Sequence, residues 1–132
     1  MKTILILEDT LILQKYYTEL FKSSEELVGY NLLAARNVAD AESLMLRNDI
    51  DLFVVDWLLG KSTESEIVLT GIDFVKKVRH HYKYEMTPVI MVTSVSEKEQ
   101  IREALNYKID GYMLKPIVKE TFIAKIKKHL PL

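Results

Sequence analysis

The stretch Ile4-Leu5-Ile6-Leu7-Glu8-Asp9 joins an apolar run to two acidic residues near the amino terminus. A second stretch of the same kind, Leu52-Phe53-Val54-Val55-Asp56, ends in a single aspartate. Short, continuous apolar runs without alternating polar residues are typical of strands covered on both faces, and such strands form parallel sheets between layers of helices. The two stretches therefore predict a buried parallel sheet whose strands lead into carboxylates.

Strand-like runs of this kind alternate along the chain with segments of helical periodicity. The runs are Thr3 to Leu7, Asn31 to Ala35, Asp51 to Val55, Val89 to Thr93 and Gly111 to Leu114. The first helical segment is indicated by an apolar face made by Leu13, Tyr16, Tyr17, Leu20 and Phe21. The second, Val38 to Leu46, follows a candidate N-cap at Asn37, and the fourth opens with the capping box Ser96-Glu97-Lys98-Glu99. The third and the last segments are Ile72 to Val78 and Lys119 to Leu130. This alternation predicts an α/β fold, a five-stranded parallel sheet with helices on both faces and right-handed crossovers.

Composition and charge limit the classes of function. The chain has 132 residues, 48% of them hydrophobic, which suits one compact domain with a real core. Lys and Arg total 18 against 19 Asp and Glu, so no net field favours nucleic acid, and we expect no direct binding to it. Cysteine is absent, which excludes disulfides and thiolate metal sites. The apolar run at the amino terminus is too short for a signal peptide or a membrane span, so we expect a cytoplasmic protein without membrane insertion.

Polar side chains follow four of the five expected strands, directly where each run ends. They are Glu8 and Asp9, Asp56, Thr93 and Lys115. Taken singly, each has an ordinary explanation as a helix cap, a turn residue, a backbone partner or a solvated charge. In an open parallel sheet, however, ligands bind outside the carboxyl ends of the strands, where the strand order reverses. The joint arrangement therefore favours a site for phosphoryl chemistry at that edge.

At this level of detail the sequence resembles the receiver domain of bacterial two-component response regulators, over nearly its whole length. The matching stretches are Ile4-Leu5-Ile6-Leu7-Glu8-Asp9, Leu52-Phe53-Val54-Val55-Asp56, Ile90-Met91-Val92-Thr93-Ser94 and Asp110-Gly111-Tyr112-Met113-Leu114-Lys115-Pro116. The resemblance implies a doubly wound, flavodoxin-like topology and a single receiver domain over residues 1–132 without an output domain. Whether the chain acts alone or is part of a longer protein stays open.

The resemblance also assigns roles around the acceptor. Asp56 would be the phosphoacceptor, and Glu8, Asp9 and Asp56 would hold Mg²⁺ together with the backbone carbonyl of Leu58. Three carboxylates at one edge repel one another and so recruit a cation or retain protons. Magnesium prefers oxygen ligands and bridges carboxylates to phosphoryl oxygens. The residue types are thus those that such a reaction needs.

Further residues would sense the phosphoryl group. The Thr93 hydroxyl would bond it, Lys115 would pair with it, and Tyr112 falls at the aromatic switch position of the family. Phosphorylation adds charge and acceptor oxygens, draws Thr93 inward and lets the aromatic ring follow. The surface that changes would comprise the fourth helix, the fifth strand and the last helix, with the exposed helical residues Arg102, Glu103 and Asn106.

The implied partners are a sensor histidine kinase or a histidine phosphotransfer protein, and a downstream target. The chain would be no enzyme in the ordinary sense, since it would only transfer a phosphoryl group to its own Asp56 and slowly lose it. A haloacid-dehalogenase phosphatase would need an aspartate where Leu58 stands, and a P-loop is absent. The alternative that remains is a degenerate receiver, a protein-interaction module that works without phosphorylation.

Two departures from the family pattern stand out. The connection after Asp56 is extended, and the glycine that matches the family is Gly71, so the start of the third helix is uncertain. We expect the polar stretch 60–66 within this connection, 58–70, to be a mobile loop. Leu58 and Val95, each two residues after a site residue, are apolar and cannot orient an attacking water, which predicts slow autodephosphorylation.

The histidines are expected to have no catalytic role. His80 and His81 close the third helix and His129 lies in the last one. A cation complements the dipole at a helix carboxyl end, so we expect all three on the solvated surface.

Overall fold

The computed structural model describes residues 1–61, 68–94, 106 and 108–132. The fourth helix expected from Ser96, with Arg102 and Glu103, lies outside these residues, as does Val95. Of the surface residues expected on that helix, only Asn106 is described, in a turn.

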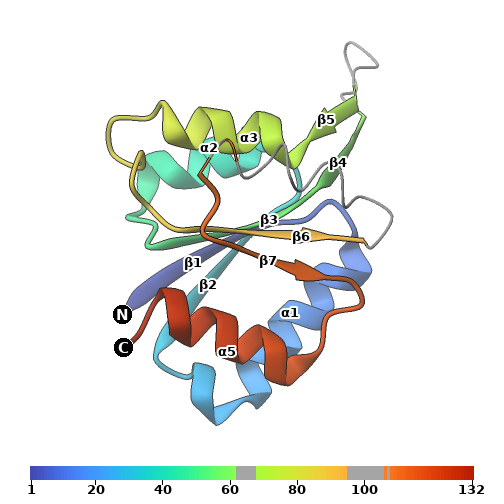
Figure 1. The fold of residues 1–132 in the computed structure, drawn as a ribbon. Coiled ribbons are helices and arrows are strands. Elements are labelled where there is room, and N and C mark those ends of the chain that lie inside the picture. Colours follow the sequence, from blue (N-terminus) through green and yellow to red (C-terminus); the bar gives the residue numbers. More distant parts are fainter. Residues whose placement is uncertain (62–67, 95–105, 107) are drawn as a thin grey trace.

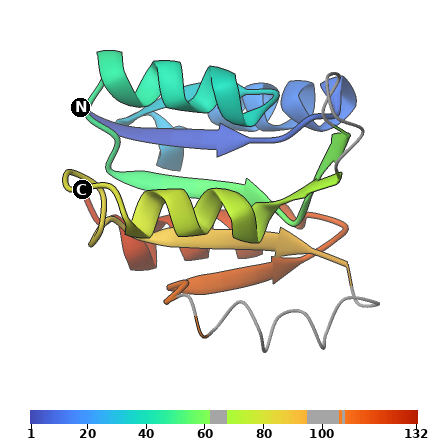
Figure 2. The same ribbon diagram turned by 90° about the horizontal axis from the view of Figure 1, so that it is seen from above.

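Five strands form one parallel sheet in the order β2-β1-β3-β6-β7. Every neighbouring pair is parallel, so each connection must cross over the sheet. Because β1 and β3 lie in the interior and the chain winds outward from them in both directions, the doubly wound topology is confirmed (Figures 1 and 2). The strands are β1 Lys2–Leu7, β2 Tyr30–Ala35, β3 Leu52–Asp56, β6 Val89–Thr93 and β7 Gly111–Leu114, each close to its expected range.

Helices cover both faces of this sheet (Figure 1). α1 and α5 lie on one face, and α2 and α3 on the other. The helices are α1 Leu11–Ser23, α2 Val38–Arg47, α3 Gly71–Arg79 and α5 Lys119–His129, with a short 3-10 turn at Glu25–Leu27. The Asn37 side chain accepts a hydrogen bond from the Asp40 N–H at 2.8 Å, which confirms the expected N-cap of α2.

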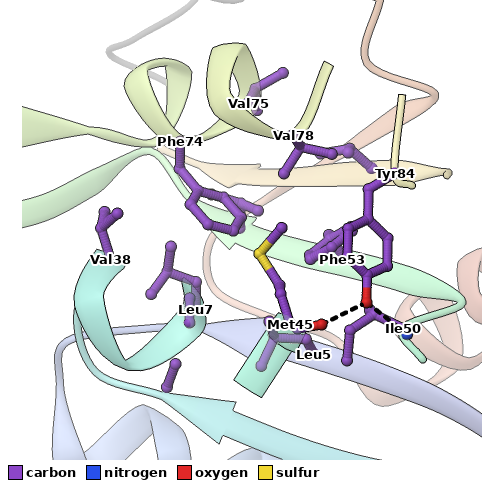
Figure 3. Close-up of a cluster of buried hydrophobic side chains, with 14 of the residues drawn as sticks. Leu5, Leu7, Val38, Met45, Ile50, Phe53, Phe74, Val75, Val78 and Tyr84 are labelled. Atoms are coloured by element: carbon purple, nitrogen blue, oxygen red, sulfur yellow. Dashed lines mark hydrogen bonds between the residues drawn. The ribbon is translucent and has the colours of Figure 1, made fainter. Parts of the chain in front are cut away.

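The central strands are buried on both faces, which explains their continuous apolar sequence. In β1, Leu5 and Leu7 pack under α2 and α3, whereas Ile4 and Ile6 pack toward α1 and α5. Side chains alternate between the two faces of a strand, so a strand inside a sandwich needs apolar residues at every position. Figure 3 shows the first cluster, in which the ring of Phe53 meets Phe74 and Tyr84 edge to face at 5.7 and 5.4 Å.

The connection after β3 differs from the expected mobile loop. It contains two antiparallel strands, β4 Leu58–Lys61 and β5 Val68–Thr70, so the expectation was wrong for residues 60 and 61. The rest of the expected loop, 62–66, lies outside the described residues. The base of this hairpin is closed because the Gly71 N–H donates to the Trp57 carbonyl at 2.5 Å. Gly71 also opens α3, which settles where that helix begins.

The expectation for the histidines holds in part. His80 is exposed in the turn after α3, but His81 is half-buried and stacks on the ring of Tyr82 at 5.0 Å. For His129 the expectation was wrong, because its Nε2 atom is buried and has no hydrogen-bond partner among the described residues. The ring packs over Gly111 at the start of β7, where a side chain would approach Nε2 to 3.0 Å.

Candidate functional site

Strand register brings the expected site residues to one edge of the sheet. Asp56 is the last residue of β3 and pairs with Val92 of β6. The Lys115 N–H, directly after β7, donates to the Thr93 carbonyl at 2.7 Å. Glu8 directly follows β1, which lies on the other side of β3. The polar ends of four strands therefore face a common edge.

Three carboxyl groups form a cluster at this edge. One oxygen each from Glu8, Asp9 and Asp56 lies within 4.8 Å of the other two. Glu8 is 1% exposed and Asp56 5%, whereas Asp9 is half-buried. The structure thus places together the residues expected to hold a metal ion.

Glu8 is held in place by its own loop. Its N–H donates to the Ala35 carbonyl at 3.0 Å, and its Oε1 accepts from the Thr10 N–H at 3.2 Å. The Gln14 side chain donates to the Glu8 carbonyl at 2.9 Å. Its second carboxyl oxygen, Oε2, is buried and has no hydrogen-bond partner among the described residues. A buried, ionised carboxyl oxygen without a partner is costly, so this atom calls for a bound cation or for a proton shared with the Asp56 carboxyl group, with which the Glu8 side chain interacts.

Burial and mutual repulsion alter the protonation of the cluster. Burial, together with the charge of Asp56, raises the pKa of Glu8 to about 7, although Lys115 and Thr10 act in the opposite direction. Burial likewise raises the pKa of Asp56, against the lowering effect of its contact with Lys115. The cluster therefore favours an extra proton or a bound cation over three separate negative charges.

Lys115 forms an ion pair with the expected acceptor. Its ammonium lies 2.8 Å from Asp56 Oδ1, and its side chain is 33% exposed. Thr93 is buried, and its hydroxyl makes a long contact of 3.5 Å to the Ser94 carbonyl. Tyr112 is 43% exposed on β7. The Lys115 ammonium is thus paired with the Asp56 carboxylate, and Thr93 lies at the end of the neighbouring strand β6.

Gly71 lies against the backbone of the acceptor strand. A Cβ atom there would come within 2.4 Å of the Asp56 carbonyl oxygen and 2.7 Å of the Met91 methyl group. Real Cβ atoms do not approach backbone atoms so closely, so only glycine permits α3 to start here. The glycine identified from the sequence therefore has a steric reason.

The carbonyl of Leu58 is directed away from the hairpin ladder. Leu58 pairs with Thr70, and the bond between the Gly71 N–H and the Trp57 carbonyl flanks that pair. In an antiparallel ladder this pattern makes Leu58 and Thr70 a non-hydrogen-bonded pair, whose own N–H and C=O groups point outward. The ladder itself therefore does not use the carbonyl expected to bind a metal.

Sequence reasoning missed an apolar groove beside the site. The groove has a volume of about 510 Å³ and is lined by Leu13, Tyr16, Lys115, Pro116 and Ile117. The Tyr16 hydroxyl donates to the Ile117 carbonyl at 3.2 Å and so ties α1 to the loop that carries Lys115. No periodicity joins residues so far apart in the chain, so the sequence carries no signal for it.

The sheet topology, the acid cluster and the lysine opposite it define the receiver class of signalling domains. The sequence profile of the family described as "Response regulator receiver domain" matches residues 4–127, and the chain belongs to this family. Among the described residues, no helix combines the length and apolar character that crossing a bilayer requires.

Two chemotaxis proteins are similar to this chain over most of their length. A "Chemotaxis protein CheY homolog" of Campylobacter jejuni is 26% identical over 129 residues, covering 96% of this chain and 91% of the relative. "Chemotaxis protein CheY-3" of Vibrio cholerae is 28% identical, with 95% and 88% covered. The solved structure of Vibrio cholerae chemotaxis protein CheY4 is 23% identical, has a TM-score of 0.81, and covers 98% of this chain and 99% of the other. This last similarity concerns the fold alone.

Proposed function

We propose that the protein is the phosphoacceptor switch of a two-component phosphorelay. Asp56 accepts a phosphoryl group from a phosphohistidine on a sensor kinase or on a histidine phosphotransfer protein. The observation that carries the proposal is the geometry of Asp56, whose carboxylate is ion-paired with Lys115 and clustered with two further acids.

The residues present fit Mg²⁺. The three carboxyl groups offer only oxygen donors, as this ion prefers, and Glu8 Oε2 is a buried oxygen in need of a partner. The receiver domain of a Pseudomonas aeruginosa sensor kinase, 18% identical with a TM-score of 0.76 and 97% and 96% of the two chains covered, is described with magnesium coordinated in its active-site cleft. Glu8, Asp9, Asp56 and the Leu58 carbonyl would hold the ion. When bound, it would neutralise the carboxylates and bind a phosphoryl oxygen.

The chemistry follows from the side chains. The ion pair with Lys115 favours the ionised form of Asp56, which is a nucleophile that needs no general base. As an oxygen of Asp56 forms its bond to phosphorus, the bond from phosphorus to the donor imidazole nitrogen breaks, and its electron pair remains on the imidazole. The Lys115 ammonium, 2.8 Å from Asp56, and the Thr93 hydroxyl then stabilise charge on the transferred oxygens.

The switch acts through the neighbouring surface. Phosphorylation draws Thr93 toward the added oxygens and shifts a pre-existing equilibrium, in which the ring of Tyr112 turns inward from its present exposed position. A downstream target reads this change on the fourth helix, β7 and α5.

The proposal also covers the location of the protein in the cell and the reactions that it catalyses. The protein works in the cytoplasm, neither inserts into membranes nor binds nucleic acid directly, and catalyses only its own phosphorylation and slow dephosphorylation. A degenerate receiver that signals without phosphate is the second candidate, and the intact ion pair between Asp56 and Lys115 disfavours it.

Intact mass after incubation with acetyl phosphate and Mg²⁺ tests the proposal. The wild type should gain one phosphoryl group, and chelation of the metal should prevent the gain. Asp56→Asn should gain nothing, while the matched variant Asp51→Asn, changed near the other end of β3, should behave as the wild type. Absence of any gain in the wild type would favour the degenerate receiver.

A further inference from the structure

β7 carries Tyr112, the proposed switch aromatic, and leads into Lys115, yet within the part of the chain that the structure describes it is the least secured strand of the sheet. It lies at an edge, pairs only with β6 in the described sheet and has four residues. Of these, only Met113 is buried, packed with the α5 side chains. A strand with so little buried surface contributes few contacts that could fix its position.

The apolar pattern of β7 does not by itself define its register against β6. Tyr112, Met113 and Leu114 are all apolar or aromatic, so a shift of one residue would still offer an apolar side chain to the core. Such a shift turns every side chain to the opposite face. It would also carry Lys115 away from Asp56. Gly111, which packs under His129, opposes the shift only weakly, because the His129 ring is the end of a side chain in the last turn of α5.

A polar contact at the start of the strand does define the register. The Asp110 carboxylate accepts the Val89 N–H at 2.8 Å, and the Asp110 N–H donates to the Val89 carbonyl at 2.8 Å. The same carboxyl oxygen of Asp110 lies 3.0 Å from the Arg79 guanidinium. Only one alignment of β7 on β6 brings Asp110 to Val89.

The Arg79 side chain is itself held in place by several contacts, so it can fix the position of Asp110. Its side chain is 12% exposed. Its guanidinium donates to the Lys108 carbonyl at 2.7 and 3.1 Å, and to the Thr87 carbonyl at 2.7 Å. Lys108 has a φ of 60°, the left-handed conformation that a tight turn into Asp110 requires. Arg79 therefore joins the end of α3 to the segments that enter β6 and β7.

We propose that the Arg79–Asp110 pair sets the register of β7 and thereby acts as a positioning pair for Tyr112 within the strand and for Lys115 just beyond its other end. The effect on phosphorylation rests on the proposed function, but the effect on register does not. In the native register the Lys115 N–H meets the Thr93 carbonyl at 2.7 Å, next to the Asp56 ion pair.

The test measures register directly by NMR, from the scalar coupling across the hydrogen bond between the Lys115 N–H and the Thr93 carbonyl. In Asp110→Ala this coupling should be lost or strongly reduced in the folded protein. Asp51→Ala is the matched control. Asp51 also accepts a strand N–H, that of Thr3 at 2.8 Å, but β1 pairs on both sides. The control should therefore keep the coupling. A full coupling in folded Asp110→Ala would overturn the proposal.

If Asp110→Ala folds poorly, two further variants still test the proposal. Asp110→Asn retains an acceptor oxygen for Val89 and should keep the coupling, whereas Arg79→Gln should weaken it while Asp110 remains. Equal couplings in Arg79→Gln and the wild type would contradict the role of Arg79.

Rates of phosphorylation by acetyl phosphate, compared at equal folded fraction, supply the functional readout. We expect a fall of about tenfold or more in the variants that lose the coupling, because small displacements of catalytic groups cost that much. A purely structural role would lower stability and leave this rate unchanged, and such a result would overturn the positioning role. If no protein, wild type included, is phosphorylated, the proposed function fails while the NMR result still decides the register.

Discussion

The two ends of the central sheet are built in opposite ways. At the amino ends of the strands, polar groups are paired: Asp51 accepts the Thr3 N–H, and Asp110 accepts the Val89 N–H, both at 2.8 Å. At the carboxyl ends, carboxyl groups are gathered and buried, and the pKa of Glu8 is raised to about 7 by burial and by the charge of Asp56. The first end stabilises the fold, whereas the second gives up stability for a site that can bind a cation and accept a phosphoryl group.

Gly71→Ala should have the largest effect on stability, because it disturbs the packing at the carboxyl ends of the strands. The new Cβ would lie 2.4 Å from the Asp56 carbonyl oxygen, and relief requires α3 to move. We expect a loss of about 3 kcal/mol or more in the free energy of unfolding, measured by urea titration.

Gly29→Ala is the matched control for this prediction. Its Cβ would meet the Leu132 side chain at 2.5 Å, but Leu132 is 72% exposed and can turn away. Equal losses for the two glycine variants would contradict the claim that the approach to Asp56 is special.

Tyr84→Phe tests the amino end of the sheet. The hydroxyl of this buried residue donates to the Met45 carbonyl at 2.9 Å and the Asn48 carbonyl at 2.8 Å (Figure 3 shows the contact with Met45). Its removal leaves buried acceptors unsatisfied, so we expect a loss of about 1–3 kcal/mol in unfolding free energy. Tyr82→Phe, at a side chain 89% exposed, should change nothing measurable. If Tyr84→Phe were as stable as the wild type, the idea of a paired, stabilising end would fail.

Leu58→Asn tests the lifetime of the phosphoryl group at the carboxyl ends of the strands. An amide two residues after Asp56 could orient the attacking water, so the acyl phosphate should decay faster by about threefold to tenfold, a change of about 1 kcal/mol in the barrier. Decay is followed by mass spectrometry after the phosphodonor is removed. An unchanged rate, or a faster wild type, would contradict the expected slow autodephosphorylation.

We expect the smallest effect on stability from a change at His129. This residue lies near the amino ends of the strands but, unlike Asp51 and Asp110, has a buried nitrogen without a hydrogen-bond partner among the described residues. Burial lowers its pKa, with Lys128 and Lys125 acting in the same direction and Asp110 against it. A folded pKa below the unfolded value means that stability is lost as the pH falls below about 6.5. His129→Gln should reduce this loss, by less than about 1 kcal/mol because the ring is partly exposed, in urea titrations from about pH 7 to 5. An identical pH profile in the variant would show that the buried Nε2 atom has no such effect.

The sequence was informative where one residue's environment follows from its neighbours in the chain. Apolar runs such as Ile4 to Leu7 reveal buried strands because a strand covered on both faces has no polar position. Glu8 and Asp56 could be placed at one edge because the carboxyl ends of parallel strands meet there. The N-cap at Asn37 followed from equally local chemistry.

The features that escaped prediction depend on contacts between distant segments. Arg79 contacts the Lys108 carbonyl and the Asp110 carboxylate some thirty residues away, and nothing in the adjoining sequence indicates these partners. Residues 60 and 61, at the end of β4, were expected in a mobile loop because the stretch 60–66 is small and polar, whereas the base of the β4–β5 pair is set by a bond between the distant Trp57 and Gly71. The burial of His129 arises only when α5 docks over Gly111.

The most direct test of the central claim is the unfolding free energy of wild type and Glu8→Gln at about pH 8, with and without Mg²⁺. The folded pKa of Glu8, about 7, exceeds its unfolded value of 4.5, so its charge costs stability above pH 7 and little near pH 5. Without metal, Glu8→Gln should be more stable by on the order of 1–3 kcal/mol, and the gain should shrink toward pH 5. Mg²⁺ should stabilise the wild type and the exposed control Glu19→Gln more than Glu8→Gln. A Glu8→Gln protein that is less stable than the wild type without metal, and gains as much from Mg²⁺, would contradict the account.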